Sequence, residues 1–100
     1  MGNKKITYRK YLGLEKILDA QNPLSSILNK PVHDEMLFII IHQIYELWFK
    51  QIIHEIDSII EYFSNPLINE TNINTVVNRL DRIHSIQKIA ISQIDILKSM

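Results

Sequence analysis

Apolar residues recur along this chain at helical spacings, and its few glycines and prolines fall where helices are expected to break. The first predicted helix spans about residues 10–20, followed at once by Asn22 and Pro23, which should stop it. One side of that helix carries Tyr11, Leu14, Leu18 and Gln21. Residues 23–32 are predicted to form a loop.

A second, much longer helix is predicted from about residue 34 to residue 63. His33 or Asp34 can cap its start, where acidic residues suit the positive end of the helix dipole. Residues 36–49 are apolar on nearly every side, which predicts that this part is buried. In the second half the apolar face consists of Ile52, Ile56, Ile59, Ile60 and Phe63. The opposite, polar face consists of Lys50, His54, Asp57 and Glu61.

A third helix is predicted from about residue 73 to the end, after a loop over residues 64–72. Its apolar seam recurs in steps of four and three and consists of Val76, Leu80, Ile83, Gln87, Ala90, Ile94 and Leu97. The seam is flanked by Val77, His84 and Ile91. Such a seam predicts a helix packed along another helix. With no strand signal of comparable strength, the fold class is all-α, with long antiparallel helices.

Three helices this apolar have more apolar surface than they can hide from water among themselves. The pattern of the third helix also continues to Leu97 and Met100 without a glycine cap, a proline stop or a polar tail. We therefore expect residues 1–100 to be one piece of a larger helical protein, or else an obligate oligomer.

Composition narrows the function classes. The hydrophobic fraction of 46% and the charged fraction of 22% are typical of a globular protein. Lys+Arg and Asp+Glu both total 11, so the chain lacks the basic excess that nucleic acid or an anionic membrane requires. No cysteine is present, which excludes disulfides and thiolate metal sites. No signal peptide or membrane-spanning run is apparent, so a cytoplasmic location is predicted.

The strongest candidate for chemistry is His42, with Phe38, Tyr45 and Glu46 at helical spacings of three and four. An imidazole beside aromatic rings suits a flat apolar ligand that has one hydrogen-bonding group. The alternative is an ordinary core helix whose histidine is satisfied by Glu46, and spacing alone favours this alternative.

Three other features have simpler explanations. A protein-ligated metal site built from His42 and Glu46, with His33, Glu35, His54 and Glu55 nearby, is disfavoured, because the Glu-x-x-His motif of metal-binding bundles is absent. Trp48 is interpreted as a buried packing anchor. An aromatic edge formed by Tyr8, Tyr11 and Leu12 is expected either to pack on the long helix or to contact a ligand or another subunit.

Longer stretches of the sequence carry more information about function than the spacing of single residues. The run HDEMLFIIIHQIYELWFKQIIHEID (residues 33–57) closely resembles the N-terminal signature of the tryptophan 2,3-dioxygenase family. TYRKYLGLEKILDAQNPLS (residues 7–25) resembles the opening tyrosine segment of that family. ILKSM (residues 96–100) resembles the end of its next helix, with Lys98 and Ser99 in place of the usual Glu-Thr. The resemblance covers nearly the whole chain.

The resemblance implies an all-α, tetrameric enzyme that binds haem b. Such an enzyme inserts both atoms of O2 across the indole C2–C3 bond of L-tryptophan and yields N-formylkynurenine, in the kynurenine pathway of tryptophan catabolism. Members are far longer than this chain. By resemblance, the proximal histidine that ligates the iron, a carboxylate-binding arginine and a threonine at the substrate ammonium lie beyond residue 100. No metal ligand is therefore expected within this chain, which should be inactive alone.

The resemblance also assigns roles to particular residues. It implies that the substrate site is lined by Phe38, Ile39, Ile40, Ile41 and His42. Phe38 would pack on the indole ring, and His42 would be the distal, catalytic histidine that hydrogen-bonds the indole N–H. The substrate site of a neighbouring subunit would receive Tyr8, Tyr11 and Leu12.

Two alternatives remain beside this interpretation. The chain could be a non-catalytic helical module that associates with itself or with a partner. It could also belong to a related haem enzyme that acts on another aromatic amino acid.

Overall fold

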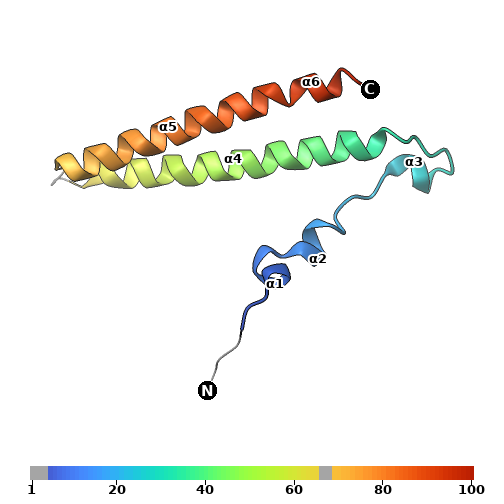
Figure 1. Cartoon of the computed structure of the whole chain (residues 1–100), viewed down its shortest axis with the longest axis horizontal. Helices are drawn as coiled ribbons and strands as arrows, with labels where there is room; N and C mark the ends of the chain where they lie inside the picture. The colour runs from blue at the N-terminus through green and yellow to red at the C-terminus, as the bar shows by residue number, and fades with distance from the viewer. Residues whose placement is uncertain (1–4, 66–68) are drawn as a thin grey trace. The chain divides into compact units, whose positions relative to one another are not determined.

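The computed structural model describes residues 5–65 and 69–100. All regular structure in these ranges is helical, which confirms the all-α prediction. In chain order the elements are α1 (Tyr8–Leu12), α2 (Leu14–Ile17), α3 (Leu24–Ile27), α4 (Glu35–Ser64), α5 (Glu70–Ser92) and α6 (Ile94–Leu97) (Figure 1). The chain divides into two compact units, Met1–Ile40 and Ile41–Met100, which are described separately.

In the first unit, the predicted helix over residues 10–20 is replaced by two short helices. Thr7 caps α1, since its hydroxyl oxygen accepts a hydrogen bond from the Lys10 amide at 3.2 Å. Gly13 then adopts a left-handed conformation (φ 62°) that ends α1 and begins α2. The single-helix prediction was wrong because the left-handed glycine interrupts the helix while the apolar spacing continues through it.

The predicted loop over residues 23–32 contains one further turn of helix, α3, and is fastened to the start of α4 by Glu35. The Glu35 carboxylate accepts hydrogen bonds from the Leu24 amide at 3.1 Å and from the Ser25 amide at 3.0 Å. It also accepts one from the Ser25 hydroxyl, whose oxygen in turn accepts from the Val32 amide at 3.0 Å. A single carboxylate thus holds both ends of the loop together.

These contacts make the loop sensitive to acid. The hydroxyl and amide of Ser25 lower the pKa of the Glu35 carboxyl below its ordinary value of 4.5; burial acts the other way, and the Leu24 amide adds to the lowering. The stabilisation is therefore complete above pH 4.5 and is lost as the pH falls through the lowered pKa. We expect the Leu24 and Ser25 amide NMR signals to shift in an acid titration. In a Glu35→Gln variant the two signals should not follow that transition; an unchanged titration would contradict the fastening role.

In the second unit, residues 41–64 of α4 pack against α5 to form an antiparallel pair, here called the helical hairpin (Figure 1). Its core consists of Ile59, Val76 and Ile83, with Ile52 and Tyr62 packed against them. The long second helix is confirmed within a residue or two of its predicted bounds.

The third predicted helix differs from the structure at both of its ends. It begins earlier, at Glu70, because the Asn69 side chain caps it by accepting from the Asn72 amide at 2.9 Å. It also ends earlier, at Ser92, and a last helical turn follows as α6. The predicted seam is only partly correct, since Val76 and Ile83 are buried whereas the Leu80 side chain is half exposed.

The prediction that residues 36–49 are buried was wrong for this chain. Only Ile41 is buried, at 3% exposure, whereas Phe38 remains 50% exposed and Leu47 54%. Along the second half of α4, most of the predicted apolar face is likewise exposed, namely Ile56, Ile60 and Phe63. One neighbouring helix can cover only one stripe of α4, so the remaining apolar surface faces outward. The surplus of apolar surface expected from the sequence is thus present in the structure.

By length and composition α4 could also cross a membrane, contrary to the absence of such a segment predicted from the sequence. A central helix of a larger helical protein has the same length and composition. Glu46 and Lys50 lie in the middle of α4, and charged groups at that depth are rare in membrane spans. These two residues favour a core helix over a membrane span.

Candidate functional site

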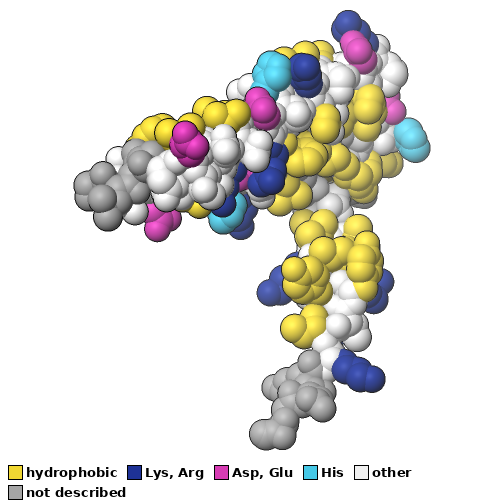
Figure 2. Space-filling model, turned by 60° about the vertical axis from the view of Figure 1, so that its left-hand side comes forward, with side chains coloured by type: hydrophobic (Ala, Val, Ile, Leu, Met, Phe, Trp, Pro, Cys, Tyr) yellow, Lys and Arg dark blue, Asp and Glu magenta, His cyan; other side chains and the backbone are white. Residues whose placement is uncertain are grey.

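An open, mostly apolar hollow of about 920 Å³ lies along the helical hairpin. From α4 it is lined by His42, Tyr45, Glu46, Phe49 and Ile52. From α5 and α6 it is lined by Gln87, Ala90, Ile91, Ile94 and Leu97. Figure 2 shows hydrophobic side chains gathered on the surface of the hairpin. Several predicted seam residues therefore border an open hollow instead of a closed helix–helix contact.

Three rings follow one another along α4 at the hollow. The His42 and Tyr45 rings meet edge to face, with centroids 6.4 Å apart and an interplanar angle of 79°. The Tyr45 and Phe49 rings are stacked, with centroids 6.3 Å apart. The Tyr45 hydroxyl donates a hydrogen bond to the Ala90 carbonyl oxygen on α5 at 2.8 Å. This arrangement can receive a flat apolar ligand and offer it one imidazole.

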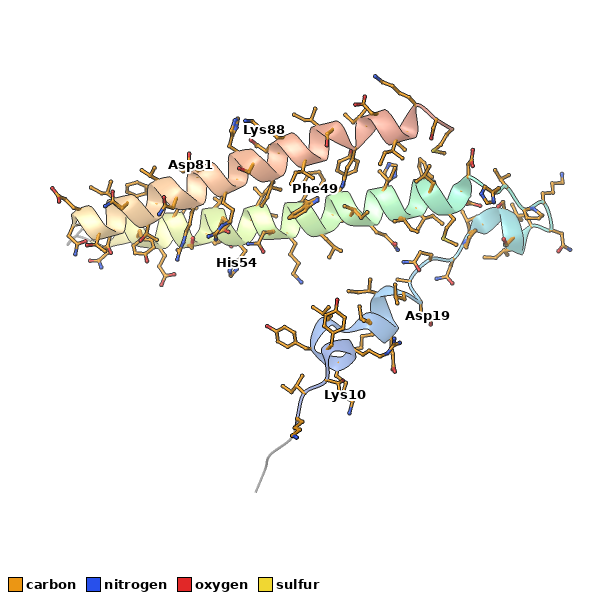
Figure 3. All side chains as sticks on the ribbon, in the orientation of Figure 1. Lys10, Asp19, Phe49, His54, Asp81 and Lys88 are labelled. Atoms are coloured by element: carbon orange, nitrogen blue, oxygen red, sulfur yellow. The ribbon has the colours of Figure 1, made fainter. Side chains whose placement is uncertain are left out.

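His54 lies apart from this row. In Figure 3 it projects from α4 away from α5, while Asp81 and Lys88 project from α5 away from α4. The orientation of His54, which is exposed, agrees with its predicted place on the polar face of the long helix. Within the described ranges no three His, Asp or Glu side chains are grouped so that they could hold a metal ion.

An ion pair between a buried carboxylate and a partly exposed guanidinium joins α4 to α5 on another part of the hairpin. The Glu55 side chain is 3% exposed, and its Oε2 atom accepts hydrogen bonds from Arg82 Nη1 at 2.7 Å and from Gln51 Nε2 at 3.0 Å. The Arg82 hydrogen bond lowers the pKa of the Glu55 carboxyl; burial opposes this effect, and Gln51 and the charge of Arg79 add to it. The guanidinium of Arg79 in turn lies 5.2 Å from the ring centroid of Tyr62.

Sequence reasoning considered Glu55 only as a neighbour of a disfavoured metal group and missed its structural role. A signal was present, because Ile41, Trp48, Glu55 and Ile59 follow one another at spacings of seven, seven and four. Those spacings place all four on one stripe of a helix. A carboxylate on an apolar stripe needs a cationic partner from the facing helix.

Trp48 contacts a second, smaller hollow of about 430 Å³, which it shares with Ile44, Leu47, Gln51 and Gln93. Its side chain is only partly buried, so its predicted role as a packing anchor is only partly met. The buried Trp48 Nε1 and Gln93 Oε1 atoms have no hydrogen-bond partner among the described residues. A donor and an acceptor are thus both left unsatisfied beside the same hollow.

The site residues implied by the resemblance are divided between the two units of the structure. His42 is exposed and borders the large hollow, whereas Ile41 is buried within the hairpin. Phe38, Ile39 and Ile40 belong to the first unit; Phe38 and Ile40 are exposed, and Ile39 is partly buried. Three further residues lie on α1, and all of them are exposed: Tyr8 (73%), Tyr11 (77%) and Leu12 (40%).

Comparison with known proteins places this chain in a family. The family model for tryptophan 2,3-dioxygenase matches residues 1–100. A tryptophan 2,3-dioxygenase of Bdellovibrio bacteriovorus is 50% identical over 95 residues, which is 95% of this chain and 26% of the relative. Relatives with the same name from Dictyostelium discoideum and Aedes aegypti are each 52% identical, over 97% and 93% of this chain and 24% of their own length. The chain thus spans about a quarter of its curated relatives, and it belongs to the tryptophan 2,3-dioxygenase family.

Proposed function

We propose that this chain forms one part of a haem-dependent dioxygenase that converts L-tryptophan and O2 to N-formylkynurenine. The observation that carries the proposal is the apolar hollow bordered by His42 and two aromatic rings, in a chain that matches this family throughout. Because the chain spans about a quarter of its relatives, the remaining parts of the site would come from the rest of the polypeptide.

The residues present fit one face of a haem site. The hollow of about 920 Å³ is in the size range of ligand pockets, and most of its lining is apolar. Phe49, Ile91 and Ile94 would contact a flat macrocycle. Bound haem would supply the iron that binds and activates O2. The protein ligand of the iron is proposed to lie outside this chain, which spans about a quarter of its relatives.

His42 is proposed to orient the substrate. A neutral imidazole has one nitrogen that accepts a hydrogen bond, and the indole of tryptophan has one N–H to donate. Bonding between them would fix the indole plane and turn its C2–C3 bond toward the reacting oxygen. Phe38, which precedes His42 by four residues on α4, would pack against the ring. Placement of the substrate in this way lowers the barrier to reaction.

The N-terminal aromatic edge is proposed to complete the site of a neighbouring subunit in a tetramer. The Tyr8 and Tyr11 side chains are 73% and 77% exposed on α1. Large exposed aromatic side chains are typical of contact surfaces.

The test is tryptophan turnover by the complete haem-loaded protein that contains this chain. We expect O2 uptake that depends on L-tryptophan, with N-formylkynurenine as the product identified by absorbance and mass. Other aromatic amino acids should support little uptake; faster uptake with one of them would shift the substrate assignment. The 100-residue chain alone should show no turnover, and strong turnover by it would contradict the proposed division of the site.

A second candidate is a non-catalytic helical module that self-associates. It is favoured by the exposed apolar side chains along α4, including Ile56, Ile60 and Phe63. This candidate predicts concentration-dependent association in sedimentation that tryptophan does not alter, and no turnover by the complete protein.

A further inference from the structure

We infer that Tyr45 is a positioning residue for the His42 imidazole. The inference rests on the proposed function, because it concerns how the substrate-side histidine is held. Tyr45 follows His42 by three residues on α4, and its ring meets the imidazole edge to face, with centroids 6.4 Å apart. His42 borders an open hollow, and the Tyr45 ring forms a wall beside its imidazole.

The Tyr45 ring is itself fixed on two sides. Its hydroxyl donates to the Ala90 carbonyl oxygen at 2.8 Å, and its face stacks on Phe49 at a centroid distance of 6.3 Å and an interplanar angle of 17°. The hydroxyl ties the ring to α5, and the stacking limits its tilt. A ring held in this way is a rigid support for the imidazole beside it.

The end of α5 explains why the Ala90 carbonyl is available. The last four carbonyl groups of a helix have no intrahelical partner, and Ala90 lies two residues before α5 ends at Ser92. The Tyr45 hydroxyl supplies the missing donor. The sequence did not predict the break between α5 and α6. Because the Tyr45 hydroxyl bonds to a carbonyl oxygen at this break and the Tyr45 ring contacts His42, the position of the break affects the orientation of His42.

This role predicts a selective effect on the hydrogen bond that His42 makes. A tryptophan analogue in which sulfur replaces the indole N–H cannot donate to the imidazole but has nearly the same shape. In the complete haem protein without O2, a Tyr45→Phe variant should bind L-tryptophan about threefold to tenfold more weakly, the size of one hydrogen-bond contribution. Its affinity for the sulfur analogue should change by less than about twofold, because that contact does not use the imidazole. Both dissociation constants can be measured from the ligand-induced change in the visible spectrum of the haem.

Tyr62→Phe is the matched control, because Tyr62 is another tyrosine of α4 but contacts Arg79 and lies outside the hollow of His42. We expect it to leave both dissociation constants unchanged. If Tyr45→Phe weakened both ligands equally, or neither, the positioning role would be overturned while the proposed function stood. If the unsubstituted protein bound no tryptophan, the proposed function itself would fail, and this inference with it.

Discussion

Replacing Arg82 with alanine is expected to lower the free energy of unfolding by about 2 kcal/mol. Glu55 is 3% exposed, so loss of its cationic partner leaves a buried carboxylate stabilised by Gln51 and by the charge of Arg79. Removing one member of a fully buried pair costs about 3–5 kcal/mol, but the Arg82 side chain is 58% exposed, and water can partly replace it. Urea denaturation of the two proteins followed by circular dichroism measures the difference.

The pair formed by Lys98 and Asp95 provides the control, because both of its side chains are more than 70% exposed. Lys98→Ala should change the free energy of unfolding by less than about 0.5 kcal/mol. The pKa of Glu55 is lowered in the folded state, so the effect of Arg82→Ala should be full above pH 4.5 and should shrink as the pH falls through that lowered pKa. Equal effects of the two substitutions, or no change with pH, would contradict a stabilising role for the pair formed by Arg82 and Glu55.

How much of the hairpin could be predicted is clear from Glu55 and its neighbours. The long helix followed from apolar spacing over about thirty residues, where periodicity is a strong signal. Apolar spacing did not predict which side of this helix would be packed, because isoleucine recurs around most of the helix. Glu55 is packed, whereas Ile56 and Ile60 are exposed, and only the position of α5 decides between them. The packing of α5 thus determines which side of α4 is buried, and the amino-acid sequence of α4 alone did not determine it.

The candidate site was predictable on one helix and not on the other. The spacing of three between His42 and Tyr45 is enough to predict that their rings meet, and they do. The contribution of Ala90 depends on where α5 ends and on how far it is shifted along α4. Helix ends are set by local capping and can differ from the apolar pattern by several residues, as Asn69 and Gly13 demonstrate here.

Replacing His42 with alanine is expected to lower kcat/KM for L-tryptophan in the complete protein about tenfold to a hundredfold. The substitution removes the proposed acceptor of the indole N–H and leaves that donor unpaired in an apolar hollow. The larger cost of an unpaired buried group sets the upper end of the range. Steady-state O2 uptake measures the effect, and the Soret absorbance of the purified variant measures its haem content. Haem content should stay unchanged, because His42 is proposed to face the substrate and not to ligate iron.

His54→Ala separates this role from a general effect of removing a histidine from α4. His54 lies on the same helix, projects away from α5, and does not line the hollow, so its loss should leave both kcat/KM and haem content unchanged (Figure 3). Loss of haem from His42→Ala would instead identify His42 as an iron ligand and would overturn the substrate-side assignment. Equal losses of activity from His42→Ala and His54→Ala would show that α4 tolerates neither substitution. That result would contradict the assignment of the hollow as the substrate site. A selective loss at His42 with haem retained is the one result that ties the exposed imidazole of this hairpin to the indole of the substrate.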